Sequence, residues 1–117
     1  MPAQTVTRVP KPWGYELIYA RTGRYAGKVL HVDKGKRLSR QYHREKEETL
    51  YIQTGLLDLE IGKGADVEHV ELRPGDCFHL PPGTIHRMTA LEDTDILEVS
   101  SPELEDVVRI EDDYGRA

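Results

Sequence analysis

The chain has 117 residues, of which 38% are hydrophobic and 32% are charged, and it contains a single cysteine. This length suits one domain, and a lone cysteine excludes a disulfide framework, so we expect a globular protein of the reducing cytoplasm. No apolar run approaches the roughly 18 residues of a membrane span, and residues 1–8 lack a signal-peptide pattern, which argues against membrane insertion and secretion.

The net charge of −5 is unevenly distributed along the chain. Residues 1–44 carry ten Lys/Arg and two acidic residues, a balance of +8, whereas residues 45–117 carry six and nineteen, a balance of −13. The basic residues follow no nucleic-acid-binding motif, so we expect no nucleic acid partner. Two interpretations stay open: basic and acidic strands pair across a sheet, or the basic half forms a positive rim for an anionic substrate.

Short segments of alternating apolar and polar residues, bounded by Gly, Pro or Asp, predict nine β-strands. In chain order they are Gly14–Ala20, Tyr25–Val32, Arg37–His43, Glu48–Thr54, Leu56–Ile61, Val67–Leu72, Asp76–Leu80, Ile85–Ala90 and Asp95–Ser100. No segment has a sustained helical period, so the pattern predicts one all-β domain over residues 1–117, a sandwich or a barrel. We expect loosely held ends at residues 1–10 and 102–117, although Val107, Val108 and Ile110 could form one further strand.

Polar side chains of the kind that bind metals occur in two clusters on these predicted strands. Gln41 and His43 are two residues apart, a spacing that places both side chains on the same face of a strand. Glu48 begins the next strand in an otherwise apolar inward file, where a carboxylate needs a compensating partner such as a metal ion. His86 follows the turn at Pro81-Pro82-Gly83 and can supply a fourth ligand from another strand.

Each of these residues also has an interpretation in which it binds no metal. Glu48 could belong to the charged surface run that begins at Glu45. Gln41 could hydrogen-bond a bound water instead of the metal, because a neutral amide oxygen is a weaker ligand than an imidazole. The other three histidines, His31, His69 and His79, are expected to be structural.

Two motifs resemble those of the cupin superfamily, whose fold is a jelly-roll barrel or double-stranded β-helix. The second cupin motif is matched by Pro74, Gly75, Pro81, Gly83 and His86, although Ala90 stands where Asn is usual. The first motif is matched by Gly35, Gln41, His43, Glu48 and Gly55. Gln41 replaces the first histidine of the usual pair, and this Gln-x-His pattern resembles the metal ligands of phosphomannose isomerases.

Three further segments resemble the C-terminal isomerase domain of bifunctional mannose-1-phosphate guanylyltransferase/mannose-6-phosphate isomerases. They are Lys11-Pro12-Trp13-Gly14, the segment from Gly35 to Gln41, and the segment from Val108 to Arg116. The resemblance implies a small single-domain cupin with one divalent metal ion per chain, bound by Gln41, His43, Glu48 and His86. Zinc is the first candidate, and manganese, iron, nickel and cobalt are the alternatives.

The resemblance also implies aldose–ketose isomerisation of a sugar phosphate such as mannose 6-phosphate. This reaction needs a proton-transferring group, a Lewis acid and, for a phosphorylated substrate, a cationic clamp. The candidate catalytic residues are Lys46 and Glu98, and the candidate substrate-binding residues are Lys36, Arg109 and Arg116. Two other classes stay open: a metal-dependent cupin oxygenase and a non-catalytic sugar-binding cupin.

Assembly can be inferred from the outward face of the predicted strand Glu48–Thr54. This face carries Tyr51 and Gln53, and it offers area that a symmetry mate could cover. Small proteins resembling cupins commonly pair in this way. We therefore expect a homodimer.

Overall fold

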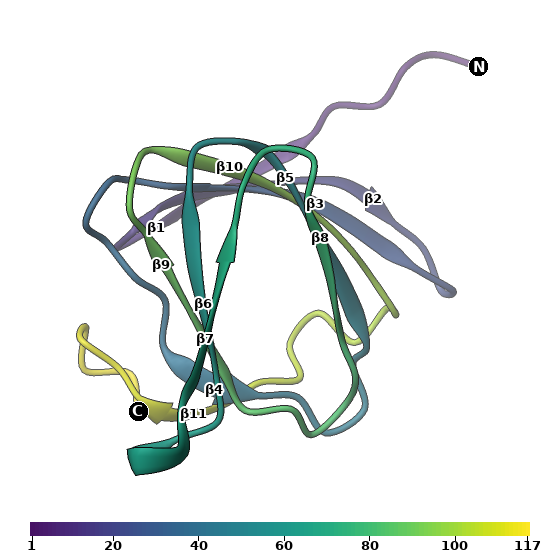
Figure 1. Cartoon of the computed structure of the whole chain (residues 1–117). Helices are drawn as coiled ribbons and strands as arrows, with labels where there is room; N and C mark the ends of the chain where they lie inside the picture. The colour runs from purple at the N-terminus through teal and green to yellow at the C-terminus, as the bar shows by residue number, and fades with distance from the viewer.

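The computed structural model describes residues 1–117 as two antiparallel β-sheets that face each other in a barrel (Figure 1). One sheet has six strands in the order β1-β2-β3-β10-β5-β8, and the other has five in the order β11-β4-β9-β6-β7. The strands are β1 (Thr7–Lys11), β2 (Gly14–Arg21), β3 (Ala26–Val32), β4 (Arg40–Tyr42), β5 (Glu48–Thr54), β6 (Leu57–Ile61), β7 (Glu68–Leu72), β8 (Cys77–Leu80), β9 (His86–Ala90), β10 (Thr94–Ser100) and β11 (Val108–Glu111). The all-β jelly-roll prediction is confirmed.

The single helical element is a 3-10 turn, η1 (Gly64–Asp66). No helix in the structure combines the length and the apolar character needed to cross a bilayer. Residues 1–6 form no strand and are exposed, and the N-terminus extends away from the barrel in Figure 1.

Eight of the nine predicted strands occur with ends that differ by at most one residue. The exception is Arg37–His43, which shortens to β4 because the segment before it pairs differently. Arg37 forms an isolated bridge with Thr89, and the Leu38 N–H donates to the Met88 carbonyl. The prediction also missed β1, an edge strand that contains a proline and no buried residue.

The barrel interior changes from apolar to charged along the strands. On β5, Leu50 and Ile52 are fully buried while Tyr51 between them is 44% exposed, as the alternation predicts. The same inward files continue with charged residues: Glu48 on β5, Lys28 on β3 and Glu98 on β10 are all buried. Lys28 and Glu98 lie opposite each other in the sheet. The apolar residues form the hydrophobic core, and the buried charged residues form the part of the interior where a functional site can lie.

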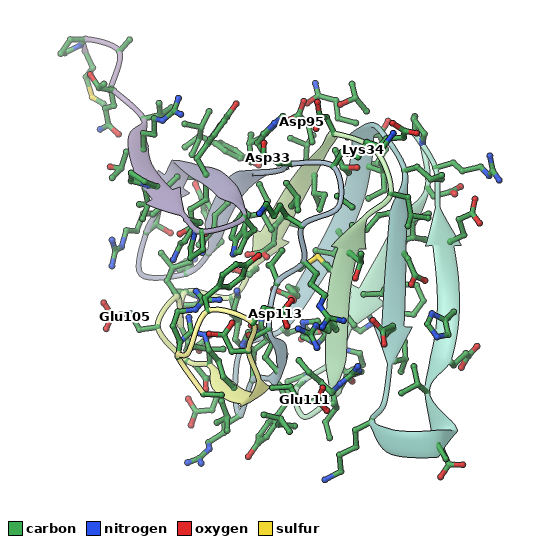
Figure 2. The ribbon with its side chains drawn as sticks, turned by 90° about the vertical axis from the view of Figure 1, so that its left-hand side faces the viewer. Asp33, Lys34, Asp95, Glu105, Glu111 and Asp113 are labelled. Atoms are coloured by element: carbon green, nitrogen blue, oxygen red, sulfur yellow. The ribbon has the colours of Figure 1, made fainter.

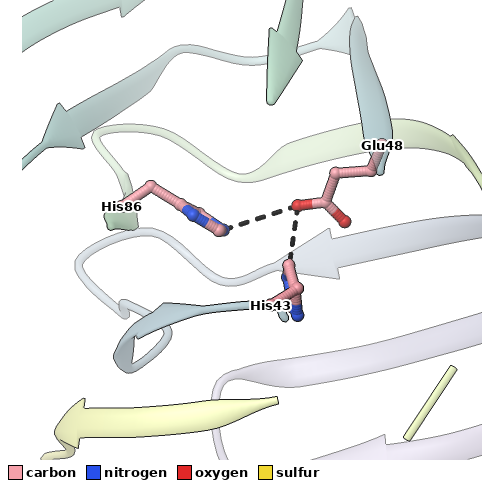
Figure 3. A group of neighbouring side chains, drawn as sticks. All are labelled: His43, Glu48 and His86. Carbon is pink, nitrogen blue, oxygen red and sulfur yellow. Dashed lines mark ion pairs between the residues drawn. The ribbon is translucent and has the colours of Figure 1, made fainter. Parts of the chain in front are cut away.

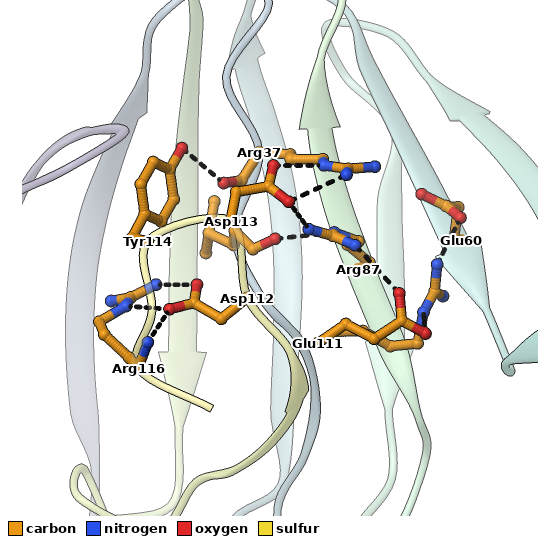
Figure 4. A network of polar contacts seen from close by, with 10 residues as sticks. Arg37, Glu60, Arg87, Glu111, Asp112, Asp113, Tyr114 and Arg116 are labelled. Atoms are coloured by element: carbon orange, nitrogen blue, oxygen red, sulfur yellow. Dashed lines mark hydrogen bonds and ion pairs between the residues drawn. The ribbon is translucent and has the colours of Figure 1, made fainter.

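The C-terminal segment is attached to the five-stranded sheet. β11 pairs with β4, and carboxylates of the tail form ion pairs with arginines of the sheet (Figure 4). Arg87, whose side chain is 2% exposed, pairs with Glu111 and Asp113 and donates from Nε to the Leu38 carbonyl. We expected residues 102–117 to be loosely held, but these contacts tie residues 108–113 to the barrel.

Basic and acidic parts of the chain pair with each other. Arg40 contacts both Glu60 and Glu111, and Lys34 pairs with Glu92. Figure 2 shows Asp33, Lys34 and Asp95 together at one end of the barrel, far from Glu105 and Glu111. Charge pairing thus accounts for part of the uneven charge distribution, in agreement with the first of the two interpretations.

Candidate metal centre

Three of the predicted metal ligands converge inside the charged part of the barrel (Figure 3). His43 directly follows β4, Glu48 begins β5 and His86 begins β9. The Glu48 Oε1 atom is 3.6 Å from His43 Nε2 and 3.4 Å from His86 Nε2. All three side chains are at most 7% exposed. The folded chain thus brings together residues separated by up to 43 positions in the sequence.

The hydrogen bonds of the two histidines leave acceptor atoms facing one another. His43 Nδ1 donates to the Asp106 carbonyl, and His86 Nδ1 donates to the Thr84 carbonyl at 2.9 Å. We assign the proton to Nδ1 because a carbonyl can only accept, so each neutral ring presents a lone pair at Nε2. Both Nε2 atoms and Glu48 Oε1 are buried without a hydrogen-bond partner, whereas Glu48 Oε2 lies 3.0 Å from the ammonium group of Lys46.

A divalent metal ion fits this set of atoms. Buried acceptors without a donor are costly, and a cation satisfies all of them at once. Two imidazoles and a carboxylate are typical ligands of zinc and of other divalent transition metals. A histidine ligand also commonly donates its second ring N–H to a backbone carbonyl, as both histidines do here.

A tight turn fixes one histidine against the other. Gly83 has a φ of +83°, a conformation that favours glycine, and its N–H donates to the His43 carbonyl at 2.7 Å. His86 follows three residues later and begins β9. The turn that leads into one ligand is therefore bonded to the backbone of the other.

Gln41, the fourth predicted ligand, is on β4 directly opposite His86. It lines the same pocket as His43. Its Oε1 atom accepts a hydrogen bond from the Ser39 hydroxyl at 2.7 Å. Because an amide oxygen has two lone pairs, one acceptor position stays free. Ligation by Gln41 therefore stays a prediction.

Lys46 and Glu98 extend the site beyond Glu48. The Lys46 Nζ atom lies 3.0 Å from Glu48 Oε2 and 3.1 Å from Glu98 Oε2, and the side chains of Lys46 and Glu98 are each 5% exposed. Burial, together with the negative charge of Glu48, raises the pKa of Glu98 to about 7. Burial alone would lower the pKa of Lys46, but the two carboxylates outweigh it and raise that pKa. An acidic and a basic group thus meet beside the metal ligands.

The pocket next to these residues is rich in cations. Its lining includes Lys11, Lys28, Arg109 and Arg116 together with Lys46 and His43. Lys28 is paired with Glu16 at 3.3 Å, and Arg116 is paired with Asp112. The Arg109 Nε atom is buried and has no hydrogen-bond partner. Arg109 therefore has a free donor for an anionic ligand.

The predicted substrate-binding residues differ in where they lie. Arg109 and Arg116 both reach the pocket, whereas Lys36 is exposed and does not line it. Lys36 closes the turn that follows β3, since its N–H donates to the Asp33 carbonyl at 2.9 Å.

Sequence reasoning missed three charged residues of the site: Glu16, Lys28 and Asp106. Lys28 carried a usable signal, because it lies in the same inward file as the buried Leu30, as Glu48 does with Leu50. Asp106 carried none, since it lies in an irregular segment between two strands.

Fold and site together define a small β-barrel protein with an interior cluster of two histidines and one carboxylate that could hold a metal ion. The sequence matches the family model of the cupin domain (Cupin_2) over residues 28–100. Because this match covers more than half of the chain, the protein belongs to the cupin domain family. The comparison with curated proteins returned no match.

Solved structures support the same fold. KdgF from Halomonas sp. is 25% identical, with a TM-score of 0.71 over 87% of this chain and 91% of that chain. A Streptomyces PAC13 variant with uridine is 14% identical, with a TM-score of 0.77 over 95% of this chain and 88% of that chain. The capsular polysaccharide assembling protein CapF from Staphylococcus aureus is 16% identical, with a TM-score of 0.75 over 91% of this chain and 34% of its own. The latter two likenesses concern the fold alone.

Proposed function

We propose that this cupin is a metal-dependent isomerase that interconverts the aldose and ketose forms of a sugar phosphate, with mannose 6-phosphate as the first substrate to test. The buried contact of Lys46 with both Glu48 and Glu98 carries this proposal. Lys46 and Glu98 would serve as a proton-transferring pair beside the candidate metal ligands, and both line the pocket that also contains Lys11, Lys28 and Arg109.

His43, Glu48 and His86 would hold the metal, with Gln41 as a fourth ligand from the protein. The bound divalent ion supplies Lewis acidity that stabilises negative charge on substrate oxygens. The chain itself excludes water from the ligands, because the three side chains that converge are almost completely buried.

Glu98 would act as the base that moves a proton between the first and second carbons of the sugar. Lys46 donates a hydrogen bond to Glu98 at 3.1 Å and so holds the carboxylate toward the pocket. Its ammonium charge also favours an anionic intermediate nearby. A buried carboxylate held by a single lysine can accept and return a proton without a change in its position.

Arg109 and Arg116 would bind the phosphate group. Arg109 offers an unused buried donor, and guanidinium groups bind phosphate through paired hydrogen bonds. Arg116 is held by Asp112 through Nε and Nη2, so its Nη1 group would be the donor that reaches the phosphate. The resemblance of the segment from Val108 to Arg116 to mannose-6-phosphate isomerase domains supports the same assignment.

A cupin oxygenase is the second candidate, because the set of two histidines and one carboxylate also suits non-heme ferrous iron. Elemental analysis combined with oxygen uptake separates the two classes. Iron as the bound metal together with oxygen consumption would favour the oxygenase.

The isomerase is tested by deuterium exchange into mannose 6-phosphate and fructose 6-phosphate, followed by NMR with zinc, manganese or cobalt supplied. We expect exchange by the wild type, and a loss of roughly a hundredfold or more in Glu98→Gln and Lys46→Met, with the metal retained. Glu92→Gln, which alters an exposed carboxylate paired with Lys34, is the control and should exchange like the wild type. Absence of exchange with all three metals would contradict the isomerase for these sugars, and sugar binding without turnover would indicate a binding module.

A further inference from the structure

The segment between β10 and β11 runs along the loop that carries the metal ligands. We name residues 101–107 the strap and residues 43–48 the ligand loop. At one end of the contact, the Ser101 N–H donates to the Glu47 carbonyl at 3.0 Å, and the Glu47 N–H donates to the Ser101 hydroxyl at 2.9 Å. The strap and the ligand loop are therefore bonded in both directions at this point.

Asp106 makes the contact at the other end. One of its carboxylate oxygens accepts the N–H of Arg44 at 3.1 Å, and the other accepts the N–H groups of Glu45 at 2.7 Å and Lys46 at 2.9 Å. These backbone hydrogen bonds lower the pKa of Asp106 to about 2. The carboxylate is thus ionised at neutral pH and accepts hydrogen bonds from three successive backbone N–H groups of the ligand loop.

The backbone of Asp106 contacts a metal ligand directly, because its carbonyl accepts the hydrogen bond from His43 Nδ1. A single residue therefore fixes the ring orientation of His43 through its carbonyl and the backbone of Lys46 through its carboxylate. Neither the metal ligands nor the proton-transferring pair include Asp106.

We propose that Asp106 is a positioning residue that couples docking of the strap to binding of the metal. The inference rests on the metal centre proposed above. A cation at His43 Nε2 withdraws electron density from the ring and makes Nδ1–H a stronger donor to the Asp106 carbonyl. Because coupling is reciprocal, a docked strap raises metal affinity by the same factor as the metal strengthens docking.

The coupling has a consequence for the pocket. Leu104 and Val107 of the strap line the pocket beside His43 and Lys46. The contacts that orient the metal ligand therefore also place an apolar wall where the substrate would bind. Weaker contacts between the strap and the ligand loop should therefore loosen both the His43 ring and the apolar wall of the pocket.

The test compares zinc affinity in Asp106→Ala, Asp106→Asn and the wild type by competition with a chromophoric chelator. We expect a loss of roughly tenfold for Asp106→Ala: the carbonyl that accepts from His43 Nδ1 stays, but the carboxylate that holds it in place against the ligand loop is removed. Asp106→Asn should lose less, because its amide oxygen still accepts from the loop. Asp112→Asn is the matched control: it alters a carboxylate that has a similarly lowered pKa but contacts Arg116 instead of the ligand loop, and zinc affinity should not change.

Hydrogen exchange of the Arg44, Glu45 and Lys46 amides provides a second measurement in the wild type. Zinc should slow exchange at these amides, and this protection should be smaller in Asp106→Asn. A merely structural Asp106 would lower the free energy of unfolding but leave zinc affinity of the folded protein and its effect on exchange unchanged, which would overturn the inference. Failure of the wild type to bind any divalent metal would instead overturn the proposed function on which it rests. If Asp106→Ala does not fold, Asp106→Asn and the exchange data decide.

Discussion

Both ligand histidines donate Nδ1–H to a backbone carbonyl, and this determines what Nε2 can do. A neutral ring has one donor and one acceptor nitrogen, so neither Nε2 can donate to Glu48. Glu48 Oε2 is paired with Lys46, but Glu48 Oε1 and the two Nε2 atoms have no donor, and a metal ion would be their common partner. At the scale of the residue, the hydrogen bonds from Nδ1 to backbone carbonyls are therefore a stronger indication of a metal site than the presence of two histidines and a glutamate alone.

We expect about one divalent ion per chain in the purified protein, and loss of this ion in His43→Ala and in His86→Ala, because a site with one ligand fewer binds more weakly. Elemental analysis after gel filtration measures the occupancy. His79→Ala is the control, since His79 is 53% exposed and pairs with Glu47. Full occupancy in both ligand variants would refute the site.

The metal ligands could be found from the sequence, but their supporting residues could not. His43, Glu48 and His86 occupy motif positions, and strand alternation places them inside. Asp106 bonds to His43 across 63 positions of the sequence, a contact that no local pattern encodes. Arg109 was proposed from the resemblance of its segment, whereas the burial of its unpaired Nε became visible only in the fold.

At the scale of the element, the strands with buried residues were predictable, including the edge strands β7 and β8, whereas β1 was missed. β5 has the predicted ends because buried and exposed residues alternate along most of it. β1 and β11 have no buried residues, so their patterns are weak. β11 was expected only as a further strand that Val107, Val108 and Ile110 could form, and its partner β4 is distant in the sequence, whereas β1 pairs with the adjacent β2.

Acid should weaken the C-terminal segment through Asp112. The ion pair and hydrogen bonds with Arg116 lower the pKa of Asp112 to about 2, against about 3.9 for an unfolded aspartate. A lowered pKa contributes stability that is fully present above pH ~4 and is lost as the pH falls through ~2. We therefore expect Asp112→Asn to reduce the acid-induced fall in the free energy of unfolding between these pH values.

Urea denaturation across this pH range measures the effect. Arg116→Gln is the matched variant: it should lose the part of the pH dependence that comes from the Arg116 side chain and keep the part from the backbone hydrogen bonds to Asp112. The double variant should behave like Asp112→Asn, and a smaller slope than that of Asp112→Asn would mean that the two residues act independently.

At the scale of the whole molecule, we propose that the six-stranded sheet pairs with a second copy through its outer face. Leu17, Val29, Leu97 and Tyr51 lie opposite one another in register on four adjacent strands and form an apolar row. Tyr51 is 44% exposed and Val99, beside this row on β10, is 55% exposed. Association would remove this apolar area from water.

Light scattering at micromolar concentration should give twice the 13.4 kDa mass of the chain. Tyr51→Lys combined with Val99→Lys should shift the protein to the monomer, because two lysines would face their copies across the symmetry axis. Leu91→Lys is the control, since Leu91 is exposed on a turn outside the strands and should leave the mass unchanged. A wild type that scatters as a single chain would exclude the homodimer.

The origin of the pocket lining suggests how proteins of this kind can diverge. All of the metal ligands lie within residues 28–100, the part that matches the cupin domain. Seven of the fifteen residues that line the pocket lie outside it: Lys11, Trp13, Glu16, Leu104, Val107, Arg109 and Arg116. If the pocket binds the substrate, mutation or exchange of the two ends would alter which molecule is accepted and leave the candidate metal ligands unchanged, so that selection could act on substrate choice and on reactivity separately.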